Sequence, residues 1–189
     1  YLLDGSQVTA PMMSQAEHFG YARGDNYQAV ELLYDGEELS MVIVLPQPGH
    51  FEEFESSLTL VQLETIINNL EWVNVHLTMP KFRYESSSIS LKDALTRMGM
   101  QDAFVFGPAD FSGMDGARNL FIGDVIHKAF VSVDEAGTEA AAATAVIIMG
   151  GSAPEQPIEV TINRPFIFLI RDIETGAILF MGRIINPLG

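Results

Sequence analysis

Residues 134–157 read DEAGTEAAAATAVIIMGGSAPEQP, and the interpretation of the whole chain depends on this stretch. Its alanine run, Ala140 to Ala143, has the highest helix propensity available, so a short helix is one interpretation. The β-branched residues that follow favour a strand, and the glycine pair at 150–151 favours irregular chain. Local propensity therefore leaves helix and extended chain both open.

The composition of the same stretch favours a strand that can join a sheet. It has no proline between Glu135 and Ala153, so every backbone N–H there can take part in a sheet ladder. Alternate side chains are small at first and larger later, as a strand needs if it is to enter between two others. An uncharged strand displayed as a loop is an aggregation hazard unless insertion is its function.

The rest of the chain alternates between strand and helix patterns. Asp35-Gly36 reads as a hairpin turn between two strands, and the second of them is apolar on both faces and should be central. Helical spacing runs over 51–70, with Thr59 as a cap, and over 90–98, with an end at Gly99. Strands are expected over 8–13, 27–34, 39–45, 73–80, 120–133, 166–171 and 177–185. In the strand over 120–133 we expect core positions at Val125, Phe130, Val131 and Val133.

These patterns predict an α+β fold with more than one sheet, mostly β with a few helices. The formal net charge of −15 disfavours binding to nucleic acid, whose phosphates such a surface repels. No apolar run is long enough to cross a bilayer, so we expect no membrane partner. The chain has no cysteine, and its four histidines lack the close spacing of metal ligands, so neither a metal nor another cofactor is expected.

Residues 126–144, IHKAFVSVDEAGTEAAAAT, closely resemble the strand and loop hinge of the serpin family. Other segments resemble serpin landmarks and come in serpin order. They are Pro11-Met12-Met13, 39–46, Met79-Pro80-Lys81-Phe82, 91–104, 109–114, Asn163-Arg164-Pro165-Phe166, Phe180-Met181-Gly182-Arg183 and Asn186-Pro187. The resemblance covers almost the whole chain. It implies the carboxy-terminal part of a single serpin domain, with the reactive-centre loop at about 136–157.

The resemblance implies an inhibitor of serine proteases, with cysteine proteases also open, and not an enzyme. A protease cuts the loop and becomes acylated, and the loop then inserts as a new strand and distorts the trapped enzyme. The hinge residues are Glu135, Gly137, Thr138, Ala140, Ala141, Ala142, Ala143 and Thr144. The small residues among them match the inhibitory pattern. The alternative is a non-inhibitory serpin that acts as a chaperone or ligand carrier.

The lone histidine His127 has two interpretations. As an isolated histidine in a strand, it could be a buried core group with its hydrogen bonds satisfied. The resemblance instead places it in the region where the serpin sheet opens, with a structural role and no catalytic one.

The reactive bond has two candidates. The usual family register places it at Gly151–Ser152, whereas Met149–Gly150 is chemically more attractive because methionine suits an apolar specificity pocket. No lysine or arginine lies between Lys128 and Arg164. The expected partner is therefore a chymotrypsin-, elastase- or subtilisin-like protease and not a trypsin-like one.

A complete serpin is about twice as long as this chain, so the resemblance also implies a missing amino-terminal half. That half includes a sheet strand that must separate to admit the loop. We therefore expect that these 189 residues alone cannot trap a protease and that the amino-terminal half is their partner.

Overall fold

The computed structural model describes residues 1–135 and 156–189. Contacts divide the chain into two compact units, one of residues 1–83 with 132–189 and one of residues 84–131. The description of the whole chain as a single unit of a larger domain stays a prediction. Among the described residues, no helix is both long and apolar enough to cross a membrane.

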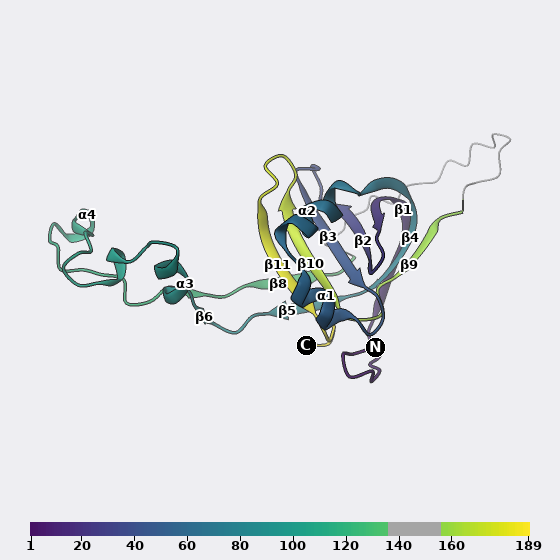
Figure 1. Ribbon diagram of the computed structural model, residues 1–189, viewed down its shortest axis with the longest axis horizontal. Coiled ribbons are helices and arrows are strands. Elements are labelled where there is room, and N and C mark those ends of the chain that lie inside the picture. Colours follow the sequence, from purple (N-terminus) through teal and green to yellow (C-terminus); the bar gives the residue numbers. More distant parts are fainter. Residues whose placement is uncertain (136–155) are drawn as a thin grey trace. The chain divides into compact units, whose positions relative to one another are not determined.

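A seven-stranded sheet forms the larger unit, in the order β11-β10-β3-β2-β1-β4-β9 (Figure 1). Neighbouring strands are antiparallel except β4 and β9, which are parallel. Its strands are β1 (Met12–Arg23), β2 (Tyr27–Leu33), β3 (Leu39–Pro46), β4 (Glu71–Pro80), β9 (Ile158–Thr161), β10 (Phe166–Asp172) and β11 (Ile178–Ile184). Together with the helices below, this confirms the predicted α+β class.

The hairpin of β2 and β3 forms where the sequence predicts it. Gly36 has φ +87°, a conformation that glycine adopts without steric cost. β3 is buried along nearly its whole length because β2 and β10 flank it and both of its faces are covered. The predicted central strand is confirmed, as are the strands expected over 73–80, 166–171 and 177–185.

The strand expected over 8–13 is wrong in its extent. β1 begins only at Met12 and continues to Arg23, through a polar stretch without a clear apolar alternation. It forms because β4 pairs with it from Met12 to Tyr21 and β2 pairs with it from Gly20 to Arg23. Pairing with a neighbouring strand thus stabilises a strand that the local sequence does not indicate.

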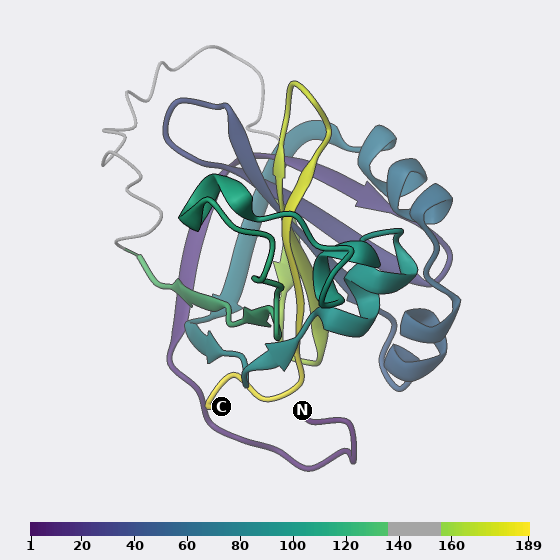
Figure 2. The same ribbon diagram turned by 90° about the vertical axis from the view of Figure 1, so that its left-hand side faces the viewer.

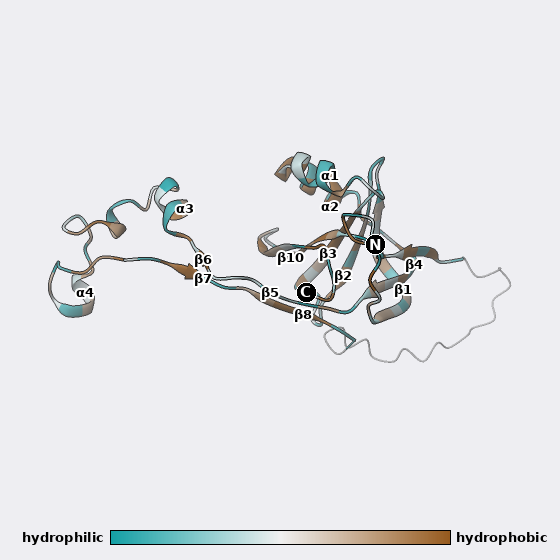
Figure 3. Cartoon of the chain, turned by 90° about the horizontal axis from the view of Figure 1, so that it is seen from below, coloured by the Kyte–Doolittle hydropathy of each residue, from teal (hydrophilic) through white to brown (hydrophobic). Residues whose placement is uncertain are grey.

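The helical stretch at 51–70 forms two helices, α1 (Phe51–Ser57) and α2 (Leu60–Asn68). Thr59 caps α2 as predicted, in a reciprocal capping box with Gln62. Both helices stand on one side of the sheet (Figures 1 and 2). Hydrophobic colour runs along the strands of the sheet, whereas the helices are of mixed colour, as expected for helices with one buried face (Figure 3). The resulting core contains Ala22, Ala29, Val42, Val44, Phe51, Phe54, Leu63, Ile66, Ile167 and Leu169.

Phe82 packs against the sheet from outside the seven strands. Its ring centre lies 5.5 Å from that of Phe166 and 5.6 Å from that of Phe168, both on β10. Phe82 begins β5 (Phe82–Glu85), which pairs with β8 (Phe130–Val133) in a two-stranded sheet. This contact fixes the start of the chain segment that leaves β4.

The smaller unit contains short elements. They are β6 (Ile89–Ser90), α3 (Lys92–Arg97), a 3-10 turn (Asp102–Phe104), α4 (Ser112–Asp115) and β7 (Ile126–His127). The predicted helix over 90–98 forms as α3, and Gly99 follows it at φ +104°. β6 and β7 pair with each other through two residue pairs.

The continuous strand expected over 120–133 is wrong, because only β7 and β8 form within it. Its predicted core positions are also wrong for the part of the chain described. Phe130 is 51% exposed, and the three valines are half-buried. The physical reason is that β8 has only β5 beside it among the described residues.

Candidate functional site at the ends of residues 136–155

The candidate site consists of the two chain ends that flank residues 136–155. The outgoing end is β8 followed by Glu135, whose carboxylate forms an ion pair with Lys81 at 2.5 Å. Lys81 follows β4 directly, and its backbone N–H donates to the carbonyl of Pro11 at 2.9 Å. The chain is thus held at the carboxy-terminal end of β4 just before the loop begins.

The hydrogen bond with Lys81 is the largest cause that holds the pKa of Glu135 below its ordinary value. Asp134 acts in the opposite direction, because its negative charge raises that pKa. The side chain of Glu135 is exposed, so water and salt screen the attraction. The pair therefore fixes the position of the chain more than it stabilises the fold.

The strand that leads to Glu135 is held by backbone pairing with residues 85–90. The N–H of Ala129 donates to the hydroxyl of Ser86, and the N–H of Ser86 donates to the carbonyl of Ala129, both at 2.8 Å. Lys128 forms an ion pair with Glu85. His127 pairs with Ile89 across β6 and β7 and is exposed, so its interpretation as a buried core residue is wrong. Its role in sheet opening stays a prediction.

The returning end is β9, which lies parallel to β4. Four residue pairs join the two strands, from Ile158 beside Val75 to Thr161 beside Thr78. The N–H of Ile162 continues the pairing by donating to the carbonyl of Thr78 at 2.8 Å. The side chains of Val160 and Ile162 are buried, so the returning chain belongs to the core soon after the loop ends.

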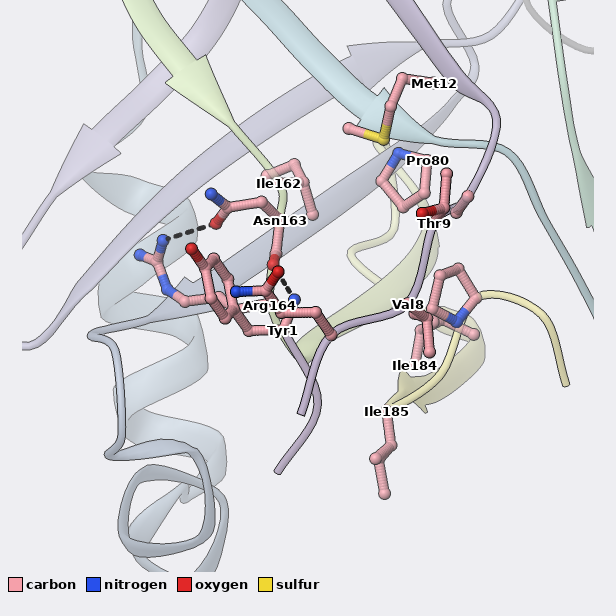
Figure 4. Close-up of a pocket in the computed structure, with 13 residues that line it drawn as sticks. Tyr1, Val8, Thr9, Met12, Pro80, Ile162, Asn163, Arg164, Ile184 and Ile185 are labelled. Carbon is pink, nitrogen blue, oxygen red and sulfur yellow. Dashed lines mark hydrogen bonds between the residues drawn. The ribbon is translucent and has the colours of Figure 1, made fainter. Parts of the chain in front are cut away.

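Arg164 anchors the turn between β9 and β10. Its Nε donates to the carbonyl of Pro46 at 2.8 Å, and its guanidinium also donates to Asn163 at 3.4 Å. Burial lowers the pKa of Arg164. A pocket of about 370 Å³ lies beside this turn, and the residues around it are shown in Figure 4. The turn therefore joins the returning chain to the end of β3.

Both ends of residues 136–155 are thus held at the same strand, β4. Lys81 just beyond β4 binds the outgoing end, and residues 75–78 of β4 pair with the returning end. The described chain on either side of residues 136–155 is therefore attached at one strand. Of the predicted hinge, Glu135 is described, and the hinge residues Gly137, Thr138, 140–143 and Thr144 lie outside the described residues. So do the reactive-bond candidates Met149, Gly150, Gly151 and Ser152.

The sequence matches a known family over nearly its full length. A profile of the family described as serpin (serine protease inhibitor) matches residues 1–187. The chain belongs to the serpin family. This confirms the resemblance drawn from residues 126–144 and from the landmark segments.

Three relatives illustrate the match. A serpin-like protein of Thermococcus kodakarensis, itself uncharacterized, is 49% identical over 95% of the chain and 42% of its own length. The human leukocyte elastase inhibitor is 42% identical, over 95% of the chain and 49% of its own length. Intracellular coagulation inhibitor 2 of Tachypleus tridentatus is 42% identical, over 92% of the chain and 43% of its own length. The serpin chain spans less than half the length of these relatives.

Lys81, His76 and Glu159 did not emerge from the sequence as site residues. Lys81 lies in the serpin landmark at 79–82, but nothing near it in the sequence connects it with Glu135. His76 and Glu159 lie in strands without any motif, and only the parallel pairing of β4 and β9 places them opposite each other. Long-range pairing of this kind leaves no local signal.

Proposed function

We propose that the complete serpin inhibits a protease by offering residues 136–157 as a substrate and inserting the cut loop as a strand. The observation that carries this proposal is the position of the hinge. In the sequence, the small residues from Gly137 begin four positions after the end of β8, which has a sheet partner on one side only among the described residues. A chain that turns back at the hinge could pair with the other edge of β8.

The energetics support insertion. A strand of roughly a dozen residues adds on the order of ten backbone hydrogen bonds, each worth about 0.5–1.5 kcal/mol net. That sum is comparable with the whole stability of a typical domain, about 5–15 kcal/mol. The loop has no proline from Ala136 to Ala153, so every one of its N–H groups in that range can take part.

The target that we propose is a protease with an apolar specificity pocket, of the chymotrypsin, elastase or subtilisin class. The residues immediately before each candidate bond are apolar or glycine, and the loop lacks lysine and arginine. One relative is named for inhibition of leukocyte elastase, which agrees with this class. As a family member, the serpin chain is assigned no catalytic role of its own.

The test uses the complete protein mixed with chymotrypsin, elastase, subtilisin and trypsin. We expect a covalent complex that survives detergent with at least one of the first three, and none with trypsin. Sequencing the new amino terminus of the cut loop should place the bond at Met149–Gly150 or Gly151–Ser152. Cleavage with release of active protease in every mixture would contradict inhibition.

A hinge variant supplies the control. Ala142→Pro removes one backbone N–H and should block strand formation without changing the residues at either candidate bond. We expect this variant to be cut at the same bond but to release the protease. The unsubstituted protein should also gain thermal stability on cleavage, and absence of that gain would favour the chaperone or carrier alternative.

We also propose that the amino-terminal half of the same serpin is the partner of this chain. The serpin chain covers 42–49% of the length of the relatives described above. β11 lies at the edge of the sheet and exposes Leu179, Phe180 and Met181 by 51%, 45% and 53%. Such a row of exposed apolar side chains is typical of a surface that another part of the protein covers.

A further inference from the structure

A pocket of about 450 Å³ lies where three connecting segments of the larger unit meet. One segment is the hairpin turn between β1 and β2, another is the chain that follows β3, and the third is the turn that holds Arg164. The N–H of Gln47 donates to the carbonyl of Asn26 at 3.0 Å, and the side-chain amide of Gln47 donates to the carbonyl of Asp25. Arg164 binds the carbonyl of Pro46, as described above. Hydrogen bonds to the backbone thus join all three segments around the pocket.

The hairpin turn that lines the pocket is closely packed. The N–H of Gly24 donates to the carbonyl of Tyr27 at 3.1 Å, which closes the turn. A Cβ on Gly24 would lie 2.2 Å from a carbon of the Tyr27 ring. This ring also packs against Phe54, with the ring centres 6.1 Å apart. The wall is therefore built before any ligand arrives, as is usual for a small-molecule site.

The register of the strands places an arginine, an amide and a leucine in one row at this end of the sheet. Arg23 at the end of β1 lies opposite Gln28 on β2, and Gln28 lies opposite Leu45 on β3. Paired residues of neighbouring strands point to the same face of a sheet, so these three side chains share one face. All three residues line the pocket, and Gln28 is held by donating to the hydroxyl of Tyr21 at 3.2 Å. The sheet register therefore brings Arg23 to the pocket.

Two arginines from separate turns line the pocket, and both lack a carboxylate partner. Neither Arg23 nor Arg164 forms an ion pair in the described part of the chain, whereas Arg171 and Arg183 of the same unit each pair with a glutamate. Arg164 donates from Nε to a backbone carbonyl and from one terminal nitrogen to Asn163. Its guanidinium extends past Asn163, and its other N–H groups have no partner among the described residues (Figure 4). These N–H groups can therefore donate to a ligand.

The balance of charge around the pocket favours an anion. Burial lowers the pKa of Arg164, because removal from water disfavours the charged guanidinium. A bound anion would offset that cost. Among the described residues that line the pocket, Asp25 supplies the only carboxylate, and it opposes an anion. The two arginines outnumber it, so the pocket is positive on a chain whose formal net charge is −15.

We propose that this pocket binds a tetrahedral oxyanion, either inorganic phosphate or the phosphate group of a small metabolite. Guanidinium groups bind phosphate through paired hydrogen bonds. A tetrahedral anion presents oxygens in several directions, so it can accept from two arginines that belong to different turns, whereas a carboxylate presents its oxygens in one plane. The pocket volume also falls in the range of small-molecule sites, about 300–1,000 Å³. Bound phosphate would join the β1–β2 hairpin to the turn between β9 and β10.

The test is a titration of the complete protein with inorganic phosphate at constant ionic strength, followed by NMR of the arginine Nε–H groups. We expect saturable shifts of the Arg23 and Arg164 signals, and none when sodium chloride replaces phosphate. Phenyl phosphate distinguishes the two sources of the anion. Tighter binding of phenyl phosphate assigns the pocket to a phosphate ester, since Tyr27 also lines it, and equal or weaker binding assigns it to free phosphate. Absence of a saturable shift with both compounds would overturn the site.

Two substitutions at the pocket should act in opposite directions, with the Arg164 signal as the reporter. Arg23→Gln should weaken phosphate binding about ten-fold, the cost of a lost hydrogen bond to a charged group. Arg23→Lys should keep part of the affinity, because it keeps the charge. Asp25→Asn should tighten binding about two- to five-fold, the range for an exposed charge pair.

Arg97→Gln is the matched control, because it removes an exposed arginine of the smaller unit, outside the pocket. It should leave the affinity for phosphate unchanged. Unchanged affinity in Arg23→Gln, or an equal loss in Arg97→Gln, would mean that phosphate binds elsewhere or through net charge alone, and would overturn the site. The titration involves neither a protease nor a cut loop, so its outcome is independent of the proposed inhibition.

Discussion

At the scale of single residues, the ion pair of Lys81 and Glu135 marks the point where the loop leaves the body of the serpin. The two side chains are 37% and 59% exposed, so their attraction contributes little to overall stability. Lys81 is fixed by its backbone bond to Pro11, whereas Glu135 has the loop beyond it. The pair therefore fixes the chain at the start of the predicted hinge.

Replacement of Lys81 by methionine should bring the pKa of Glu135 back toward its ordinary value. The carboxylate is stabilised by Lys81 in the folded state, so its pKa there is lowered and its contribution exists above the unfolded value. That contribution is lost as the pH falls from about 4.3 downward. Carboxyl NMR titration of the complete protein measures the change. Lys92→Met, which removes a lysine from the smaller unit, should leave the titration of Glu135 unchanged.

At the scale of elements, β10 and β11 approach each other closely where Gly182 lies directly opposite Phe168. A Cβ on Gly182 would come within 2.8 Å of the Phe168 ring. That ring is buried and packs against Phe82, so it cannot move aside freely. The glycine is thus required by the packing of an aromatic ring against the neighbouring strand.

Gly182→Ala should lower the free energy of unfolding by about 1–3 kcal/mol, the usual cost of overpacking. Chemical denaturation of the complete protein measures this loss. Gly123→Ala is the control, because nothing lies within 4 Å of a Cβ there, and its effect should be small. If the double variant with Phe168→Leu regains none of the stability lost by Gly182→Ala, the clash with the ring is not the cause.

The sequence predicts elements whose signals are local and misses those that depend on neighbours. β2, β3 and β10 were predicted from apolar runs and turn residues, and the cap at Thr59 from a residue of capping type just before helical spacing. β1 was largely missed because its middle is polar and becomes a strand only through its pairing with β4. The strand expected over 120–133 was predicted too long. Its apolar residues indicate a strand, but few neighbouring strands cover them.

In the candidate site, too, local features could be predicted from the sequence and long-range contacts could not. The loop and its hinge were recognised from consecutive residues, and the family match confirms the family to which they were assigned. The contacts that hold its ends, between Lys81 and Glu135 and between His76 and Glu159, join residues far apart in the sequence. The second contact becomes visible only once the register of β4 and β9 is known, and the first only once the ends of β4 and β8 are placed.

At the scale of the whole molecule, the serpin chain spans less than half the length of the relatives described above. β3 is buried along nearly its whole length, yet β11 and β8 expose apolar side chains at the margins of their sheets. A sheet edge that is both apolar and unpaired favours association with another strand. These margins are therefore where we place the amino-terminal half.

The two halves should form a soluble complex when produced together in one cell. Residues 1–189 produced alone should bind a hydrophobic dye strongly and associate, because the margins of both sheets stay exposed. Size-exclusion chromatography and dye fluorescence compare the two preparations. A monomeric chain of 189 residues with weak dye binding would contradict this assignment of the margins.

The shared dependence of both loop ends on β4 has an asymmetric consequence once the loop is severed. The upstream stub is tethered there by one screened side-chain contact, at Glu135. The downstream stub is tethered there by four residue pairs, and the half-buried Arg164 beyond it binds the end of β3. After a cut between the two stubs, the upstream stub would detach from β4 more easily than the downstream stub. The unequal strength of the two attachments therefore decides which end of the severed chain moves.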